Sequence, residues 1–135
     1  MNFPFQLFQE QYYKIEVMAL HNERGKEGES LACGYLSGRG YEVEICNWRS
    51  GHYEIDIIAT KEGILHFVEV KTRHNLTFGY PEEGVSKKKF NNLKKAASCF
   101  LFQYPNIRKI QFDILSILRE KDKPIEYFLI EDVYM

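Results

Sequence analysis

Two neighbouring stretches rich in β-branched residues, Tyr53–Thr60 and Ile64–Thr72, are separated only by Lys61-Glu62-Gly63. Such stretches on either side of a short link that contains glycine are typical of a β-hairpin. If Glu62-Gly63 is a two-residue turn, Lys61 pairs with Ile64, and that pair sets the register of the whole hairpin. The chain therefore has to build a sheet around this hairpin.

The flanking sequence predicts further elements for that sheet. A helix is expected over residues 22–37 with Asn22 as its cap, and another over residues 86–102 with Ser86 as its cap. Further strands are expected at residues 41–47, 107–118 and 125–130, with a turn at 49–51. The order α-β-β-β-α-β-β predicts an α/β fold with a mixed central sheet flanked by helices.

Gly25 and Gly28 lie near the start of the first expected helix. Each costs about 1 kcal/mol of helix stability relative to alanine, so we expect another part of the chain or a ligand to come close there. Glu29 falls on the packed face of the same helix, where an unpaired carboxylate is seldom buried.

The length of 135 residues fits one domain. We expect that domain at residues 21–135 and an N-terminal extension at residues 1–20, which is either an ordered arm or a tail upstream of a true start at Met18. No apolar run approaches the roughly 18 residues of a membrane helix, which predicts no membrane association. The chain has three cysteines, Cys33, Cys46 and Cys99, and their spacing does not match a metal site. They fit free thiols in a reducing cytoplasm.

Acidic residues interrupt the central hairpin. Strict alternation places Glu54, Asp56 and Ile58 on one face and Tyr53, Ile55, Ile57 and Ala59 on the other. The expected register sets Asp56 opposite Glu69 and Glu54 opposite Lys71, with directly opposed Cβ atoms about 4.5–5.5 Å apart. Two such acids repel each other, and a divalent cation such as Mg²⁺ or Mn²⁺ removes that repulsion. From alternation alone, a hairpin face open to water explains the same residues, so both interpretations stand.

The formal net charge of −1 conceals an uneven distribution. Residues 71–118 carry nine Lys and Arg residues against three acidic ones. This basic region follows the hairpin directly and includes the start of the second helix, where a phosphate would be supported. The neutral total therefore does not exclude a nucleic-acid partner.

Several short motifs occur in a fixed order: His21-Asn22-x-x-Gly25-x-x-Gly28-Glu29, Asn47-Trp48-Arg49, Glu54-Ile55-Asp56, Phe67-Val68-Glu69-Val70-Lys71, Val85-Ser86-x-x-Lys89 and Phe112-Asp113. Together they resemble the bacterial YraN-like (UPF0102) family over about residues 20–118. That family is similar to the PD-(D/E)xK, or restriction endonuclease-like, nuclease superfamily and to archaeal Holliday junction resolvases. The resemblance implies an α-β-β-β-α-β core.

The resemblance also implies roles for individual residues. Asp56, Glu69 and Lys71 match the catalytic positions. The metal would be held by Asp56, Glu69 and the Val70 carbonyl, with Glu29 acting through water. Glu54 is auxiliary, and the residues expected to contact nucleic acid are Lys87, Lys88, Lys89, Arg73 and Arg49. Asp113 is expected to support structure rather than chemistry.

Two functions remain open at this point. The first is a cytoplasmic Mg²⁺-dependent (or Mn²⁺-dependent) endonuclease acting on branched or single-stranded DNA, possible roles being repair or recombination. The second is a non-catalytic accessory protein that binds nucleic acid on the same fold. Resolution of a junction requires two paired cuts, so that substrate would need a homodimer.

Overall fold

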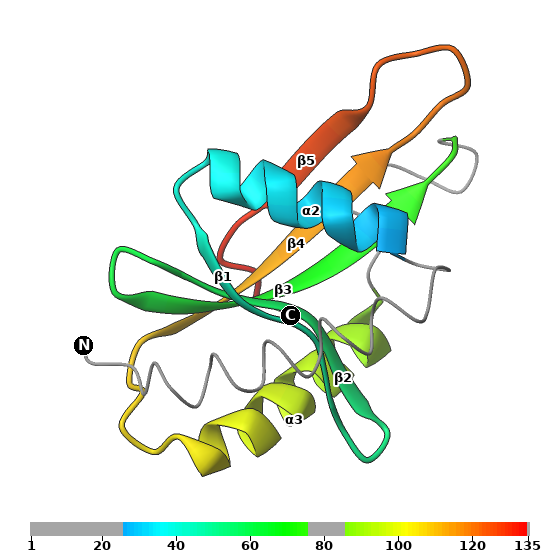
Figure 1. The fold of residues 1–135 in the computed structure, drawn as a ribbon. Coiled ribbons are helices and arrows are strands. Elements are labelled where there is room, and N and C mark those ends of the chain that lie inside the picture. Colours follow the sequence, from blue (N-terminus) through cyan, green and yellow to red (C-terminus); the bar gives the residue numbers. More distant parts are fainter. Residues whose placement is uncertain (1–25, 76–85, 135) are drawn as a thin grey trace.

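The computed structural model describes residues 26–75 and 86–134 (Figure 1). Its elements in chain order are α2 (Lys26–Gly38), β1 (Glu42–Ser50), β2 (Tyr53–Lys61), β3 (Ile64–Arg73), α3 (Lys87–Gln103), β4 (Ile110–Leu118) and β5 (Glu126–Ile130). The expected fold class and element order are confirmed. The proposed extension at 1–20, the expected helix start at 22–25 and most of the loop before α3 lie outside the described residues.

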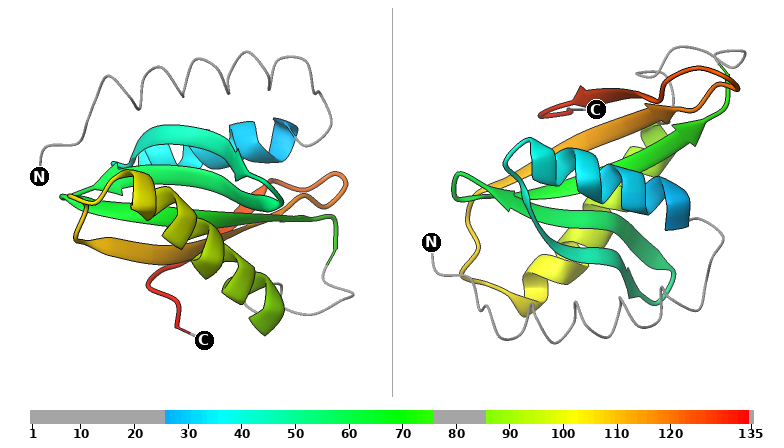
Figure 2. Two further views of the ribbon diagram at one scale, coloured as in Figure 1. Left: turned by 90° about the horizontal axis from the view of Figure 1, so that it is seen from below. Right: turned by 45° about the horizontal axis from the view of Figure 1, so that its top comes forward.

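The five strands form one mixed sheet in the order β1-β2-β3-β4-β5. Neighbouring strands are antiparallel except β3 and β4, which run parallel and are joined through α3. Helix α2 covers one face of the sheet and α3 the other (Figures 1 and 2). Neither helix of the described ranges is long and apolar enough to cross a membrane.

The central hairpin has the expected register. Lys61 pairs with Ile64, and the pairing continues to Ile57 opposite Val68. Glu62 and Gly63 both have positive φ, 53° and 79°. A two-residue turn with two positive φ angles matches the right-handed twist of the strands, which explains the glycine at the second position.

Strand β1 is longer than the sequence predicts. The expected turn at residues 49–51 is wrong, because β1 continues through Ser50, which pairs with Tyr53. The reversal falls on Gly51 and His52, where Gly51 has a φ of 60° that glycine adopts without strain. The β1–β2 hairpin thus includes the pairs Arg49–Glu54 and Ser50–Tyr53, which the expected turn would exclude.

The core has two parts, one on each face of the sheet. Under α3 lies the larger cluster, in which aliphatic side chains surround five buried aromatic residues, Trp48, Phe67, Phe90, Phe100 and Tyr104. Under α2 lies a smaller aliphatic cluster that includes Ala32, Leu36, Ala59, Val68 and Leu115. Near the end of α3, Phe100 is fully buried, whereas its neighbour Leu101 is only partly buried.

The strict alternation expected along β2 is wrong at one point. Ile55 packs into the α3 cluster, whereas Ile57 packs into the α2 cluster. The pairs on either side place Asn47 of β1 opposite Asp56, and Asn47 has a φ of 59°. The left-handed backbone of Asn47 adds a local twist to the β1–β2 hairpin. The side chains immediately before and after Asp56 therefore point to opposite faces of the sheet, whereas strict alternation predicts the same face for both.

Gly28 is required by the packing of α2 on the sheet. A Cβ at this position would lie 2.6 Å from Oγ1 of Thr72 in β3. The expected close approach at this helix is therefore confirmed for Gly28, and its partner is a strand side chain. It brings the first turns of α2 close to β3.

A buried polar network ties β3, β4 and the C-terminal segment together. His66 Nδ1 lies 2.6 Å from Asp113 Oδ2, and both side chains are almost fully buried. The other oxygen of Asp113 accepts hydrogen bonds from Gln111 Nε2 and the Asp132 backbone N–H, each at 3.0 Å. Asp113 is thus saturated by structural partners, as expected.

Candidate active site

The hairpin ladder ends where the acidic residues begin. The last β2–β3 pair is Ile57 with Val68, so Asp56 and Glu69 are not a ladder pair, contrary to the expected opposition. The Val70 backbone N–H donates to Asp56 Oδ2 at 2.8 Å. Asp56 therefore occupies a fork between the two strands and replaces a ladder hydrogen bond with a carboxylate contact.

A cavity of about 360 Å³ opens at this fork. Residues of β2, β3, α3 and the β1–β2 turn line it. They are His52, Tyr53, Glu54, Asp56, Glu69, Val70, Lys89, Asn92 and Leu93. The floor is therefore acidic and comes from the strands, while the α3 wall contributes a lysine and an amide.

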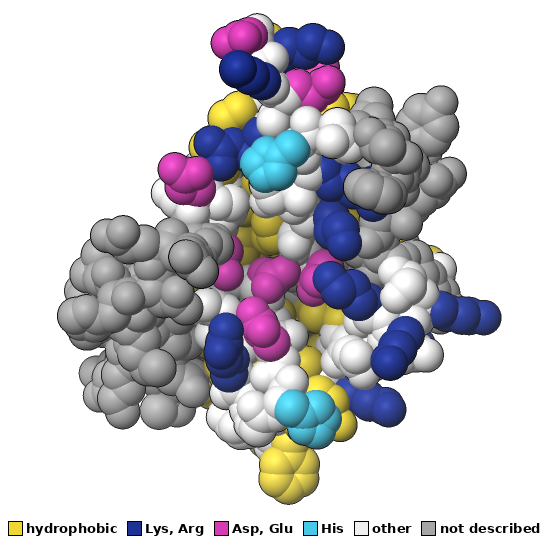
Figure 3. All heavy atoms as spheres, turned by 90° about the vertical axis from the view of Figure 1, so that its right-hand side faces the viewer, with side chains coloured by type: hydrophobic (Ala, Val, Ile, Leu, Met, Phe, Trp, Pro, Cys, Tyr) yellow, Lys and Arg dark blue, Asp and Glu magenta, His cyan; other side chains and the backbone are white. Residues whose placement is uncertain are grey.

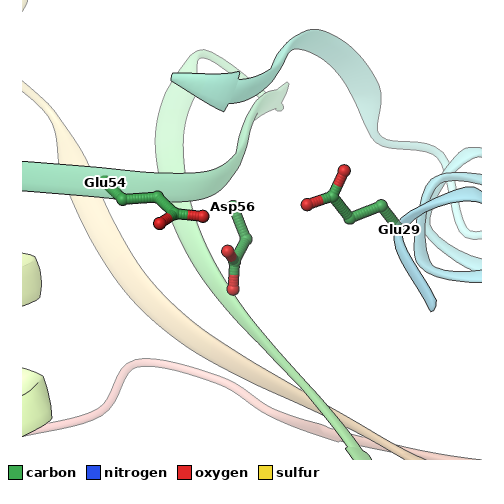
Figure 4. A group of neighbouring side chains, drawn as sticks. All are labelled: Glu29, Glu54 and Asp56. Carbon is green, nitrogen blue, oxygen red and sulfur yellow. The ribbon is translucent and has the colours of Figure 1, made fainter. Parts of the chain in front are cut away.

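Three carboxylates converge beside this cavity (Figure 4). Glu29 of α2 points toward Glu54 and Asp56 of β2, and one oxygen from each lies within 4.8 Å of the others. Glu54 is exposed, whereas the other two are partly buried. The sequence predicts Glu29 and Asp56 as ligands and Glu54 only as auxiliary, so the structure gives Glu54 a more central position.

The environment of Asp56 disfavours its charged form. Burial raises the pKa of the carboxyl to about 7, with the neighbouring Glu69 carboxylate as the next cause. The Val70 N–H opposes this rise in pKa, and the charges of Glu54 and Glu29 add to it. Asp56 thus has a perturbed pKa that burial and like charge explain together, which is typical of functional sites.

Glu69 lies next to the three carboxylates and faces α3. Its Oε1 is 3.5 Å from Lys89 Nζ, while its side chain is only 16% exposed. Burial raises the pKa of Glu69, and the ammonium of Lys89 opposes that rise. The structure therefore brings the predicted acid Glu69 and the predicted basic residue Lys89 into one ion pair.

Lys71 lies two residues further along β3, beside other cations. Burial lowers its pKa, as do the nearby charges of Lys89 and Arg73, while Glu69 opposes the effect. Lys71 is not one of the residues that line the cavity. Glu54 and Lys71 do not form the expected pair, because the β2–β3 ladder ends at Ile57 and Val68. On the other side of β2, Glu54 pairs with Arg49 of β1, and their side chains lie 3.7 Å apart.

The acidic side chains gather at the centre of one face, with Lys and Arg side chains around them (Figure 3). Lys87 and Lys88 are exposed at the start of α3. That helix begins where predicted, because the Ser86 side chain accepts from the Lys89 N–H at 3.2 Å. The two exposed lysines and Lys89 thus share the first turn of α3, which borders the cavity.

The family model described as Uncharacterised protein family UPF0102 matches residues 28–117. The chain belongs to this family. UPF0102 proteins similar to it include one from Bacteroides thetaiotaomicron, 44% identical over 76% of this chain and 85% of the relative. The UPF0102 protein from Chloroherpeton thalassium is 42% identical over 82% of this chain and 92% of the relative. The one from Flavobacterium psychrophilum is 42% identical over 87% of this chain and 98% of the relative.

The UPF0102 match spans the four carboxylates and both lysines of the site. Sequence reasoning missed other residues that line the cavity, namely His52, Tyr53, Asn92 and Leu93. The sequence could have indicated Asn92, because it follows Lys89 by three residues and therefore lies on the same face of the helix. No sequence signal could have indicated His52, since its position depends on where the β1–β2 turn falls.

Proposed function

We propose that this UPF0102 protein is a metal-dependent endonuclease that hydrolyses phosphodiester bonds in branched or single-stranded DNA. The observation that carries the proposal is the set of four carboxylates at one fork in the sheet, Glu29, Glu54, Asp56 and Glu69, next to a basic helix start. A structural role alone does not account for it, because partly buried like charges destabilise a fold.

The donor set fits a hard divalent cation. All four groups offer carboxylate oxygens, which Mg²⁺ and Mn²⁺ prefer, and no soft ligand stands among them. A cation would offset the repulsion that raises the pKa of Asp56. In this proposal Asp56 and Glu69 hold the ion with the Val70 carbonyl, and Glu29 acts through water beside Glu54.

When bound, the cation would lower the pKa of a water molecule and stabilise charge on the phosphate. The protein's own residues would position the reactants. Lys71, whose pKa is lowered by burial and neighbouring cations, would orient the attacking water through its amino group. Lys89, which is paired with Glu69, stands where it can exchange that partner for a phosphate oxygen.

The basic residues around the cavity would bind the nucleic-acid backbone. Lys87 and Lys88 are exposed at the start of α3. Arg73 is on β3, the strand that carries Glu69, and Arg49 is on β1, where it pairs with Glu54 of β2. The proposed compartment is the cytoplasm, and a homodimer is the proposed assembly for a four-way junction. Backbone contacts of this kind weaken steeply with salt, so binding that is insensitive to salt would contradict this part of the proposal.

The test is a cleavage panel of junction, flap, single strand, duplex and RNA, with Mg²⁺ or Mn²⁺. The Asp56→Asn variant keeps the side-chain shape, and the exposed Asp122→Asn in the β4–β5 turn is its matched control. We expect the wild type and the Asp122 variant to cut DNA and the Asp56 variant to be inactive. Junction binding without cutting by any variant would favour the non-catalytic accessory protein instead.

A further inference from the structure

Two of the three cysteines meet between α2 and β1. Sγ of Cys33 lies 3.2 Å from Sγ of Cys46, although the residues are 13 positions apart in the sequence. Both side chains are partly buried. Cys33 packs against the aliphatic cluster under α2, and Cys46 pairs with Ile57 of that cluster on the adjacent strand.

We propose that Cys33 and Cys46 are a redox modification site, oxidised by peroxides to a disulfide that fastens α2 to the sheet. The inference is independent of the proposed function, because it requires neither a metal ion nor a nucleic acid. It rests on the geometry of the two sulfurs and on the elements that they join.

The geometry requires little movement. A disulfide has an S–S distance of about 2.05 Å, so the sulfurs need to approach by roughly 1 Å. Cys99 is on α3, which packs on the opposite face of the sheet, and is not part of this pair.

The chemistry balances with hydrogen peroxide as the oxidant. The Cys33 thiolate attacks one peroxide oxygen, the O–O bond breaks, and the products are a sulfenic acid and hydroxide. The Cys46 sulfur then attacks the Cys33 sulfur, the S–O bond breaks, and water leaves as the disulfide forms. Overall, two thiols lose two hydrogen atoms, and one peroxide becomes two water molecules.

The surroundings indicate which cysteine reacts first. The contact with Cys46 lowers the pKa of Cys33, while burial and the nearby Glu29 charge oppose this effect. The thiolate is the nucleophilic form of cysteine, so the proposal takes Cys33 as the attacking residue and Cys46 as the resolving one.

The consequence for the molecule concerns α2. Cys33 is one helical turn beyond Glu29, so the bond would restrain the helix that carries this carboxylate. A covalent link between segments that are separate in sequence suppresses local opening. Backbone amides of Lys26–Gly38 should therefore exchange about tenfold more slowly after oxidation, and those of Lys87–Gln103 should not change.

The experiment exposes the full chain to a small excess of hydrogen peroxide and blocks the remaining thiols before reduction. We expect a peptide that links Cys33 to Cys46, a mass lower by two hydrogen atoms, full reversal by dithiothreitol and a blocked Cys99. Cys33→Ser and Cys46→Ser are matched controls in which the link cannot form. Cys46 should stay reduced in the first variant, and Cys33 should accumulate as sulfenic or sulfinic acid in the second. Separate oxidation of the two cysteines in the wild type, a link to Cys99 or to a second chain, or unchanged exchange in α2 would overturn the proposal.

Discussion

Asp56→Asn should stabilise the metal-free protein at neutral pH while it abolishes the site. The pKa of Asp56 is raised from its ordinary value of 3.8 to about 7, chiefly by burial and by Glu69. A difference of about three pKa units corresponds to roughly 4 kcal/mol of folding free energy as an upper bound. Relaxation and water at the open cavity reduce the gain, so we expect about 1–3 kcal/mol.

The sign follows from the two states of the chain. In the unfolded chain Asp56 ionises near pH 4, whereas in the folded protein it keeps its proton until about pH 7. Stability of the wild type therefore falls as pH rises between these values and stays lower above them. Asparagine does not ionise and can still accept from the Val70 N–H, so its advantage is largest at pH 8 and disappears near pH 4.

The assay is urea unfolding in EDTA at pH 4, 6 and 8, followed by circular dichroism, with Asp122→Asn as the matched control. We expect the Asp56 variant to unfold at higher urea concentration than the wild type at pH 8 and at the same concentration at pH 4. A variant that is less stable than the wild type at pH 8 would refute the reasoning, because Asp56 would then be a stabilising structural acid.

Three further substitutions test the packing around the site. Gly28→Ala should cost about 1 kcal/mol, since its Cβ would meet Thr72 Oγ1 at 2.6 Å; urea unfolding measures this, and the added Thr72→Ala should restore the loss if the clash is the cause. Ser86→Ala should cost about 1 kcal/mol through the lost α3 cap; an unchanged unfolding midpoint would contradict that role. Asp113→Ala should cost roughly 3–5 kcal/mol, because it leaves His66 without its buried partner; a loss below about 1 kcal/mol in the thermal transition would show that the network is dispensable.

The fold was largely predictable because its signals are local. The Glu62-Gly63 turn set the register of the central hairpin, and Ser86 marked the start of α3. The twist at Asn47 was not predictable, because a positive φ at asparagine has no fixed sequence pattern. That one residue explains why Ile55 and Ile57 lie on opposite faces.

The candidate site was predictable in its members and only partly in its arrangement. The hairpin register predicted that Asp56 and Glu69 lie close together on neighbouring strands. Helix periodicity predicted that Glu29 lies on the face of its helix that packs on the sheet. The fork between β2 and β3 was not foreseen, since it depends on the Val70 N–H taking a carboxylate partner. The ion pair between Glu69 and Lys89 depends on how α3 crosses the sheet, which no local pattern encodes.

The central claim is that the carboxylates at the fork form a divalent cation site. Calorimetric titration of Mn²⁺ into the wild type, Asp56→Asn and Asp122→Asn at pH 8 tests it most directly. The account predicts saturable binding to the wild type and the Asp122 variant, and its loss in the Asp56 variant. Equal Mn²⁺ binding by all three proteins, or binding by none, would contradict it.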